Sequence, residues 1–80
     1  MGDQKYEVVL KAAETGSFKE TARELGYTQA GISYLVSSLE REFGVPLFVR
    51  EYGGVRLTAD GQALLPWMQD VRNAERRLPP

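Results

Sequence analysis

The feature that most constrains the fold is the segment 17–40, SFKETARELGYTQAGISYLVSSLE, which predicts two short helices separated by a glycine. Ser17 is a favourable N-cap for the first helix, and Glu20, three residues later, completes a capping-box pattern. Gly26 stands where that helix must end, because glycine adopts the left-handed backbone conformation without steric cost. Thr28 is a suitable N-cap for the second helix. A tight helical pair is therefore expected here.

The second of these helices has two chemically different faces. The apolar face repeats at the helical period and consists of Ile32, Leu35, Val36, Leu39 and Phe43. The side chains on the opposite face are small and mostly uncharged, and they belong to Ala30, Ser33, Tyr34, Ser37 and Arg41. Gln29 lies in the first turn of the same helix. In a helix-turn-helix unit the second helix enters the major groove of DNA, where short side chains permit close approach. Thr28, Gln29 and Ser33 are then candidate base contacts, and an ordinary helical hairpin with a solvated polar face is the alternative.

A further helix is predicted before this pair. Asp3 can cap it, Gly16 ends it, and its apolar stripe consists of Tyr6, Val9, Leu10 and Ala13. Three helices with short connections predict a compact core into which Phe18 and Phe43 pack.

A β-hairpin is predicted after the third helix, because Gly44 and Pro46 prevent that helix from continuing. The β-prone runs 47–50 and 55–57 flank the sequence EYGG, which predicts a turn longer than the tightest two-residue type.

A hairpin directly after a helix-turn-helix is a wing, and this wing carries two arginines. Arg50 and Arg56 flank its turn, where they are expected to contact phosphates or enter a minor groove. The alternative for each is a solvated surface charge.

The last predicted helix begins at the N-cap Thr58 with Asp60 in its first turn, and Pro66 is expected to kink it or to start a new segment. Its apolar stripe continues to Leu78, ahead of a frayed end, and includes Leu64, Leu65, Met68 and Val71. We interpret that stripe as a dimer seam between two copies. The competing interpretation is that the helix folds back onto the chain's own core, which we expect for its first half and leave open for the rest. The expected organisation is a DNA-binding unit over residues 1–58 and a linker helix with a tail over 59–80.

Composition excludes several classes of site. The 80 residues make one domain and contain no cysteine or histidine, so disulfides, thiolate metal sites and histidine catalysis are absent. No metal, cofactor or enzymatic activity is expected. No signal peptide or membrane-length apolar run occurs, which predicts a cytoplasmic chain.

The charge balance argues against nucleic-acid binding, because ten basic and eleven acidic residues give a net charge of −1. A winged-helix module that binds another protein, with little affinity for DNA, therefore remains the alternative function.

From about Tyr6 to Met68 the chain resembles the N-terminal DNA-binding domain of LysR-type transcriptional regulators. The matching elements are Gly16-Ser17-Phe18, Ala22, Leu25, Thr28-Gln29, Ile32-Ser33, Leu39-Glu40, Gly44, Leu47-Phe48, Arg50, Arg56-Leu57-Thr58 and Gly61.

The resemblance implies a mainly α fold, with a winged helix-turn-helix followed by a long linker helix through which two copies dimerise. It implies double-stranded DNA as the partner, through Ser17, the start of the third helix and the two wing arginines. Full-length members add an effector-sensing domain, which is absent from this chain. Ala30 stands where the family often has proline, and Tyr34 where it usually has arginine or glutamine, so the target sequence is expected to differ.

Overall fold

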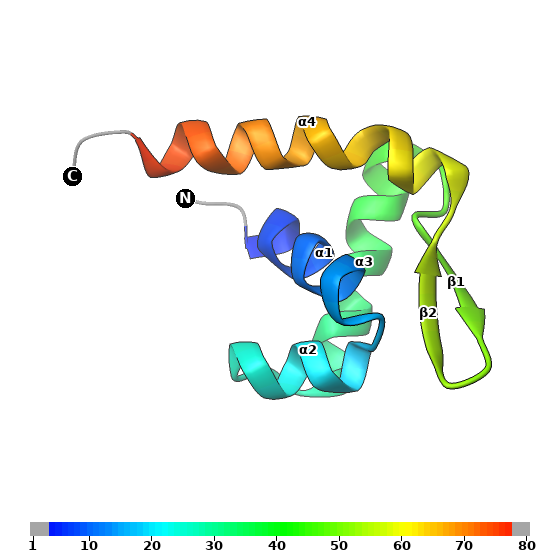
Figure 1. Ribbon diagram of the computed structural model, residues 1–80. Helices are drawn as coiled ribbons and strands as arrows, with labels where there is room; N and C mark the ends of the chain where they lie inside the picture. Colours follow the sequence, from blue (N-terminus) through cyan, green and yellow to red (C-terminus); the bar gives the residue numbers. More distant parts are fainter. Residues whose placement is uncertain (1–3, 78–80) are drawn as a thin grey trace.

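The computed structural model describes residues 4–77, in which three helices pack together, a hairpin lies beside them and a fourth helix crosses one end (Figure 1). The elements are α1 (Gln4–Thr15), α2 (Phe18–Leu25), α3 (Gln29–Phe43), β1 (Phe48–Glu51), β2 (Gly54–Leu57) and α4 (Ala59–Arg76). This is the expected winged helix-turn-helix with a long last helix. The expected cap Asp3 and the end of the apolar stripe at Leu78 lie outside the described residues. None of the helices within 4–77 is long and apolar enough to cross a membrane.

The helix starts follow from local capping, as predicted. Three side-chain hydroxyls accept a hydrogen bond from the backbone N–H three residues later, at 2.9 to 3.1 Å, and belong to Ser17, Thr28 and Thr58. Each satisfies an N–H group that has no partner inside its helix.

The expected capping box at α2 is only half formed. Ser17 accepts from the N–H of Glu20, but the Glu20 carboxylate turns outward and accepts from Nε of Arg23 at 3.0 Å. The N–H of Ser17 instead donates to the hydroxyl of Thr15 at 3.2 Å. A cation one turn away therefore displaces the reciprocal bond.

Helix α1 is buried on more sides than its sequence stripe predicts. Val8 and Ala12 are fully buried, in addition to the expected Val9 and Leu10, whereas Tyr6 and Ala13 are half-buried. The reason is that α1 packs against α2, α3, α4 and β2. The rest of the buried core comes from the other helices and the start of the wing, as Phe18, Ala22, Ile32, Val36, Leu39, Leu47 and Met68.

Helix α4 folds back onto this core, which corrects part of the expected dimer seam. Met68 has no exposed surface within its own chain, and Leu64 and Leu65 pack against the core. Met68 therefore offers no area to a second copy, while Val71 stays half-buried. Pro66 lies inside one continuous helix, so no new segment begins there.

Ion pairs hold the far half of α4 to α1. The Glu7 carboxylate of α1 lies 3.7 Å from a guanidinium nitrogen of Arg72 and 3.3 Å from one of Arg76.

The wing has the two-residue turn that the sequence did not indicate. Glu51 pairs directly with Gly54, which leaves Tyr52 and Gly53 as the turn. Gly53 has a φ of 85°, a value that favours glycine at the second turn position. Leu47, expected in the first strand, precedes it and is fully buried.

At Gly54 and Val55 the wing passes very close to the α1–α2 turn. The N–H of Val55 donates to the carbonyl of Gly16 at 3.0 Å. A Cβ atom at Gly54 would lie 2.2 Å from that same carbonyl oxygen, so this approach needs glycine.

Candidate nucleic-acid interface

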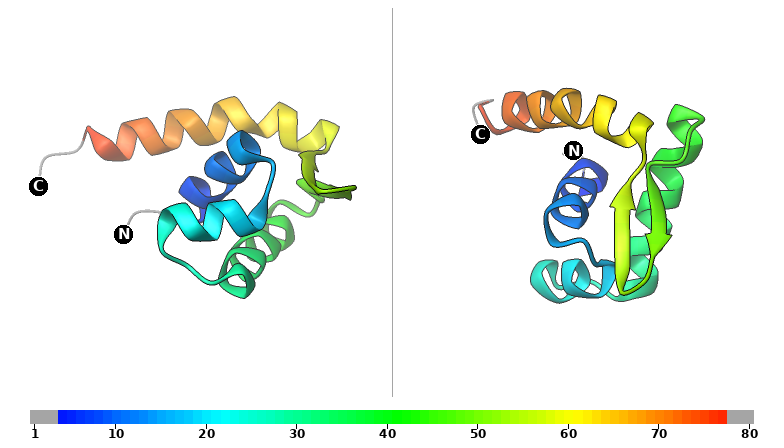
Figure 2. Two further views of the ribbon diagram at one scale, coloured as in Figure 1. Left: turned by 60° about the horizontal axis from the view of Figure 1, so that its bottom comes forward. Right: turned by 45° about the vertical axis from the view of Figure 1, so that its right-hand side comes forward.

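Helix α2, the start of α3 and the tip of the wing lie at one end of the molecule, and α4 crosses the other (Figure 1, Figure 2). The outward side chains of α3 are those expected from the sequence. Thr28, Gln29, Ala30 and Ser37 are exposed, Tyr34 is 67% exposed, and Ser33 is half-buried. A mostly small, polar helix face is thus available at this end.

Thr28 combines a structural and a chemical function. Its hydroxyl oxygen accepts from the N–H of Gly31 at 2.9 Å, which caps α3. The hydroxyl hydrogen can still be donated, because a threonine hydroxyl is both a donor and an acceptor.

A groove separates α3 from the wing, formed by two adjoining hollows that share Phe18, Arg50 and Val55. Ser33, Ser37 and Glu40 line it from α3. Its other part, beside α2, is lined by Ser17, Lys19, Gln29 and the wing turn. We call it the α3–wing groove.

Lys19 lies at this groove but was not predicted from the sequence. It is exposed, lies in the first turn of α2 and lines the α3–wing groove with Gln29 and Arg50. A cation in a first helical turn opposes the helix dipole, and this unfavourable placement is the one local signal that could have singled out Lys19.

The two wing arginines, which the sequence places on either side of the turn, lie on opposite faces of the hairpin. Arg50 pairs with Val55, whereas Arg56 pairs with Val49, and successive strand residues face opposite ways. Arg50 lines the α3–wing groove. Arg56 is on the outer face, where its Nε donates to the carboxylate of Glu51 at 2.7 Å.

The guanidinium group of Arg50 lies over an aromatic ring. Its guanidinium carbon lies 6.0 Å from the ring centre of Phe18, within range of a cation–π contact. The Phe18 ring in turn meets Phe48 edge-on at 5.4 Å between centres. Arg50 is therefore presented at the groove on a rigid apolar base.

Charge placement answers the objection raised by the net charge. Six of the described cations have carboxylate partners within 4.0 Å, namely Lys5, Lys11, Arg23, Arg56, Arg72 and Arg76. Lys19, Arg41 and Arg50 form no ion pair within residues 4–77, and all three lie along α3 or the groove beside it. Arg77, at the end of α4, is the remaining described cation without an ion pair. Three of the four unpaired cations within residues 4–77 thus lie along α3 and its groove, with Lys19 and Arg50 at the groove and Arg41 in the last turn of α3.

Three pKa shifts come from ion pairs on α1 and α2 away from the groove. The hydrogen bond from Arg23 lowers the pKa of the Glu20 carboxyl below its ordinary value, and the same bond raises the pKa of Arg23. A hydrogen bond to Glu24, together with the nearby charge of Glu14, raises the pKa of Lys11. These charges stabilise one another and are not part of the groove.

The family assignment agrees with this geometry. Residues 4–62 match the model of the family described as bacterial regulatory helix-turn-helix protein, lysR family. The chain belongs to the LysR family.

Relatives of this LysR-family chain are regulators. It is 43% identical over 68 residues to a probable nitrogen assimilation transcriptional activator of Synechococcus elongatus, an alignment of 85% of this chain. It is 33% identical over 73 residues, or 91% of its length, to the transcriptional regulator HdfR of Salmonella newport. The chain spans only 22% and 26% of the lengths of these two relatives.

The fold of this LysR-family chain matches a solved protein–DNA complex. The crystal structure of a CbnR_DBD–DNA complex superposes with a TM-score of 0.90 at 28% identity. The superposition covers 96% of this chain and 88% of that one.

Proposed function

We propose that this chain is the DNA-binding domain of a LysR-type bacterial transcriptional regulator, which binds double-stranded DNA with sequence specificity. The observation that carries the proposal is the gathering of Lys19, Arg41 and Arg50 along the exposed polar face of α3. Phosphate neutralisation by such cations supplies affinity, while side chains on the helix distinguish bases. The similarity to a DNA-bound structure supports the same function.

We assign base contacts to the N-terminal half of α3 in the major groove. Gln29 can bond the N6 and N7 edge of adenine, and Thr28 and Ser33 can donate or accept. Tyr34 and Ala30, two of the positions at which the chain departs from the family pattern, provide apolar surface for a thymine methyl group.

Backbone contacts are assigned to the rim of the groove. Arg50 and Lys19 lie on either side of it and would hold phosphates, with the hydroxyls of Ser17 and Ser37 nearby. Arg56 would reach a phosphate or a minor groove only from the outer face of the wing, after separation from Glu51.

Fluorescence anisotropy with labelled duplexes at several salt concentrations tests these assignments. Replacing Gln29 by Ala should relax discrimination at one base pair by about 1–3 kcal/mol. Replacing Arg50 by Ala should weaken binding to all sequences and reduce the salt slope by about 1. Unchanged binding in both variants would favour a protein-interaction module instead.

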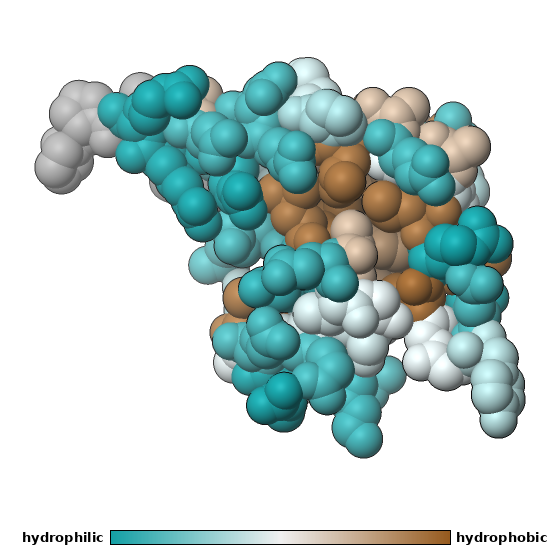
Figure 3. All heavy atoms as spheres, in the orientation of Figure 1, coloured by the Kyte–Doolittle hydropathy of each residue, from teal (hydrophilic) through white to brown (hydrophobic). Residues whose placement is uncertain are grey.

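We further propose that α4 contributes to a contact with a second copy of the chain. The helix lies at the end of the molecule opposite α2 and the wing tip, so a partner there would leave the DNA-facing end open (Figure 1). Figure 3 shows an apolar hollow beneath α4 that remains open to solvent. Leu10, Leu57 and Leu65 line it together with the polar side chains of Glu14, Gln69 and Arg72. Of the four predicted seam residues, Leu64, Leu65 and Val71 keep some exposed surface for this contact.

Sedimentation equilibrium tests the dimer. Replacing Leu65 by Glu should weaken a concentration-dependent dimer, because a charge would replace one of the apolar side chains that line the hollow. Gln62 is exposed on the same helix and provides a matched control, Gln62→Glu, which should leave association unchanged. A wild-type chain that stays monomeric at high concentration would refute the contact.

The proposed activity is binding without catalysis. It places the chain with the bacterial DNA in the cytoplasm.

A further inference from the structure

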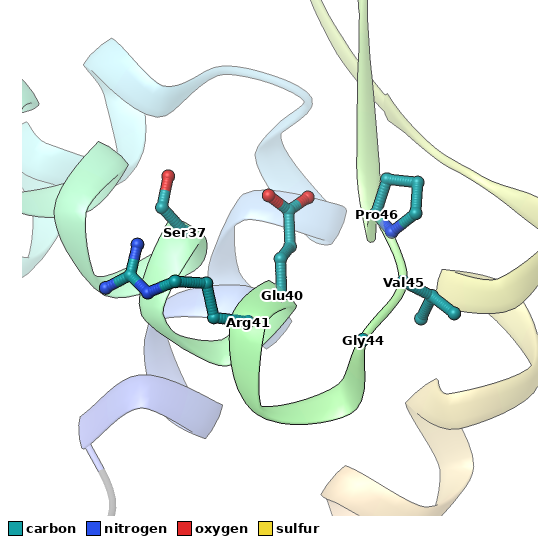
Figure 4. Close-up of a pocket in the computed structure, with 6 residues that line it drawn as sticks. All are labelled: Ser37, Glu40, Arg41, Gly44, Val45 and Pro46. Atoms are coloured by element: carbon teal, nitrogen blue, oxygen red, sulfur yellow. The ribbon is translucent and has the colours of Figure 1, made fainter.

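The Glu40 carboxylate joins the recognition helix to the wing. Its Oε2 atom accepts from the backbone N–H of Leu47 at 2.7 Å and of Phe48 at 3.3 Å. Figure 4 shows this side chain rising from the last turns of α3 beside the chain that enters the hairpin. A charged acceptor makes these bonds stronger than bonds between neutral groups.

The bonds matter because a two-stranded sheet is marginally stable without support from the rest of the molecule. Each strand of this sheet is hydrogen-bonded to the helical part of the domain. The carbonyl of Gly16 accepts from Val55 in β2, and the Glu40 carboxylate accepts from Phe48 at the start of β1. Of these two attachments, the one at Glu40 can be removed without altering any residue of the wing.

The orientation of Arg50 depends on the same strand. Phe48 and Arg50 are two residues apart in β1 and therefore face the same side. Phe48 contacts Phe18, and Arg50 lies over that ring. By holding the N–H of Phe48, Glu40 sets the rotation of β1 and with it the direction of Arg50 towards the α3–wing groove.

We propose that Glu40 is a positioning residue for DNA binding, which fixes the spacing between the base-facing side of α3 and the phosphate-facing Arg50. Glu40 itself does not touch DNA in this arrangement. The inference rests on the proposed function.

The salt dependence of DNA binding provides the test, with the whole chain and a labelled duplex. Removing a carboxylate near DNA should by itself leave the number of phosphate contacts unchanged. If Glu40 positions Arg50, Glu40→Ala should instead reduce the salt slope by about 1, as Arg50→Ala does. The double variant should show no further reduction, because one phosphate contact is lost in each case. Glu40→Gln, which keeps an acceptor oxygen at the same distance, should retain most of the wild-type slope and affinity.

Glu42 provides the charge-matched control. It lies two residues further along α3, is exposed and pairs with Lys5 of α1. Glu42→Gln removes one negative charge, as Glu40→Gln does, and should leave the slope unchanged.

Thermal unfolding of each variant shows whether binding is measured on folded protein. If Glu40→Ala does not fold, Glu40→Asp retains the charge but shortens the side chain by one methylene, and the same loss of slope is expected. Additive effects of the changes at Glu40 and Arg50, or a wild-type slope in Glu40→Ala or in a folded Glu40→Asp, would overturn this inference alone. A wild-type chain that binds no duplex would refute the proposed function together with it.

Discussion

Replacing Met68 by Ala tests whether α4 is part of the core or part of a seam between copies. Met68 is fully buried within its own chain, so truncation removes two carbons and a sulfur from the interior. At about 0.8 kcal/mol per buried methylene the transfer loss is about 2.4 kcal/mol. The cavity left behind adds to this loss, while restored rotamer freedom offsets part of it. We expect the free energy of unfolding to fall by about 2–4 kcal/mol.

Circular dichroism during heating measures this loss. For a domain of this size, about 4–8 °C is lost per kcal/mol, so the midpoint should fall by roughly 8–32 °C. The difference from wild type should be the same at low and high protein concentration, because the lost contacts lie within one chain. Gln69→Ala, an exposed neighbour on α4, should change stability by no more than about 0.5 kcal/mol. A Met68→Ala chain as stable as wild type when dilute, and weaker only in self-association, would refute this reasoning.

Three further predictions follow from local geometry. Gly54→Ala should lower the free energy of unfolding by about 1–3 kcal/mol in urea titrations, because its Cβ would collide with a carbonyl oxygen of the α1–α2 turn. Arg23 lowers the pKa of Glu20, so their ion pair stabilises the fold at pH values above the ordinary carboxyl pKa of 4.5. This contribution is lost as the pH falls through the lowered pKa of Glu20. An NMR titration of Arg23→Ala should show Glu20 titrating at higher pH than in wild type. Glu51→Gln should strengthen DNA binding measured by anisotropy if Arg56 contacts a phosphate, and should leave it unchanged if Arg56 does not.

Much of the interface was predictable because it depends on residues close together in sequence. The caps Ser17 and Thr28 and the turn at Gly26 act over three or four positions, so the bounds of α2 and α3 follow from local chemistry. The small face of α3 follows from the helical period alone. The surface placement of Gln29 and Tyr34 was therefore expected, and the structure confirms it. Their contacts with DNA remain proposals.

Other features required the tertiary structure, because they arise where distant segments meet. Arg50 and Arg56 looked equivalent in the sequence, but the strand register directs only Arg50 towards α3. In that register Gly54 lies against the carbonyl of Gly16 in the α1–α2 turn, a contact between distant segments that only a glycine permits.

The core shows the same division. A 3.6-residue period identifies an apolar stripe, but it cannot say whether the stripe meets its own chain or another copy. The folding of α4 across α1 decided this for Met68, which is fully buried. The sequence alone therefore determined which helices form and which face of each is apolar. Only the tertiary structure decided what each face touches, because that depends on contacts between residues far apart in the chain.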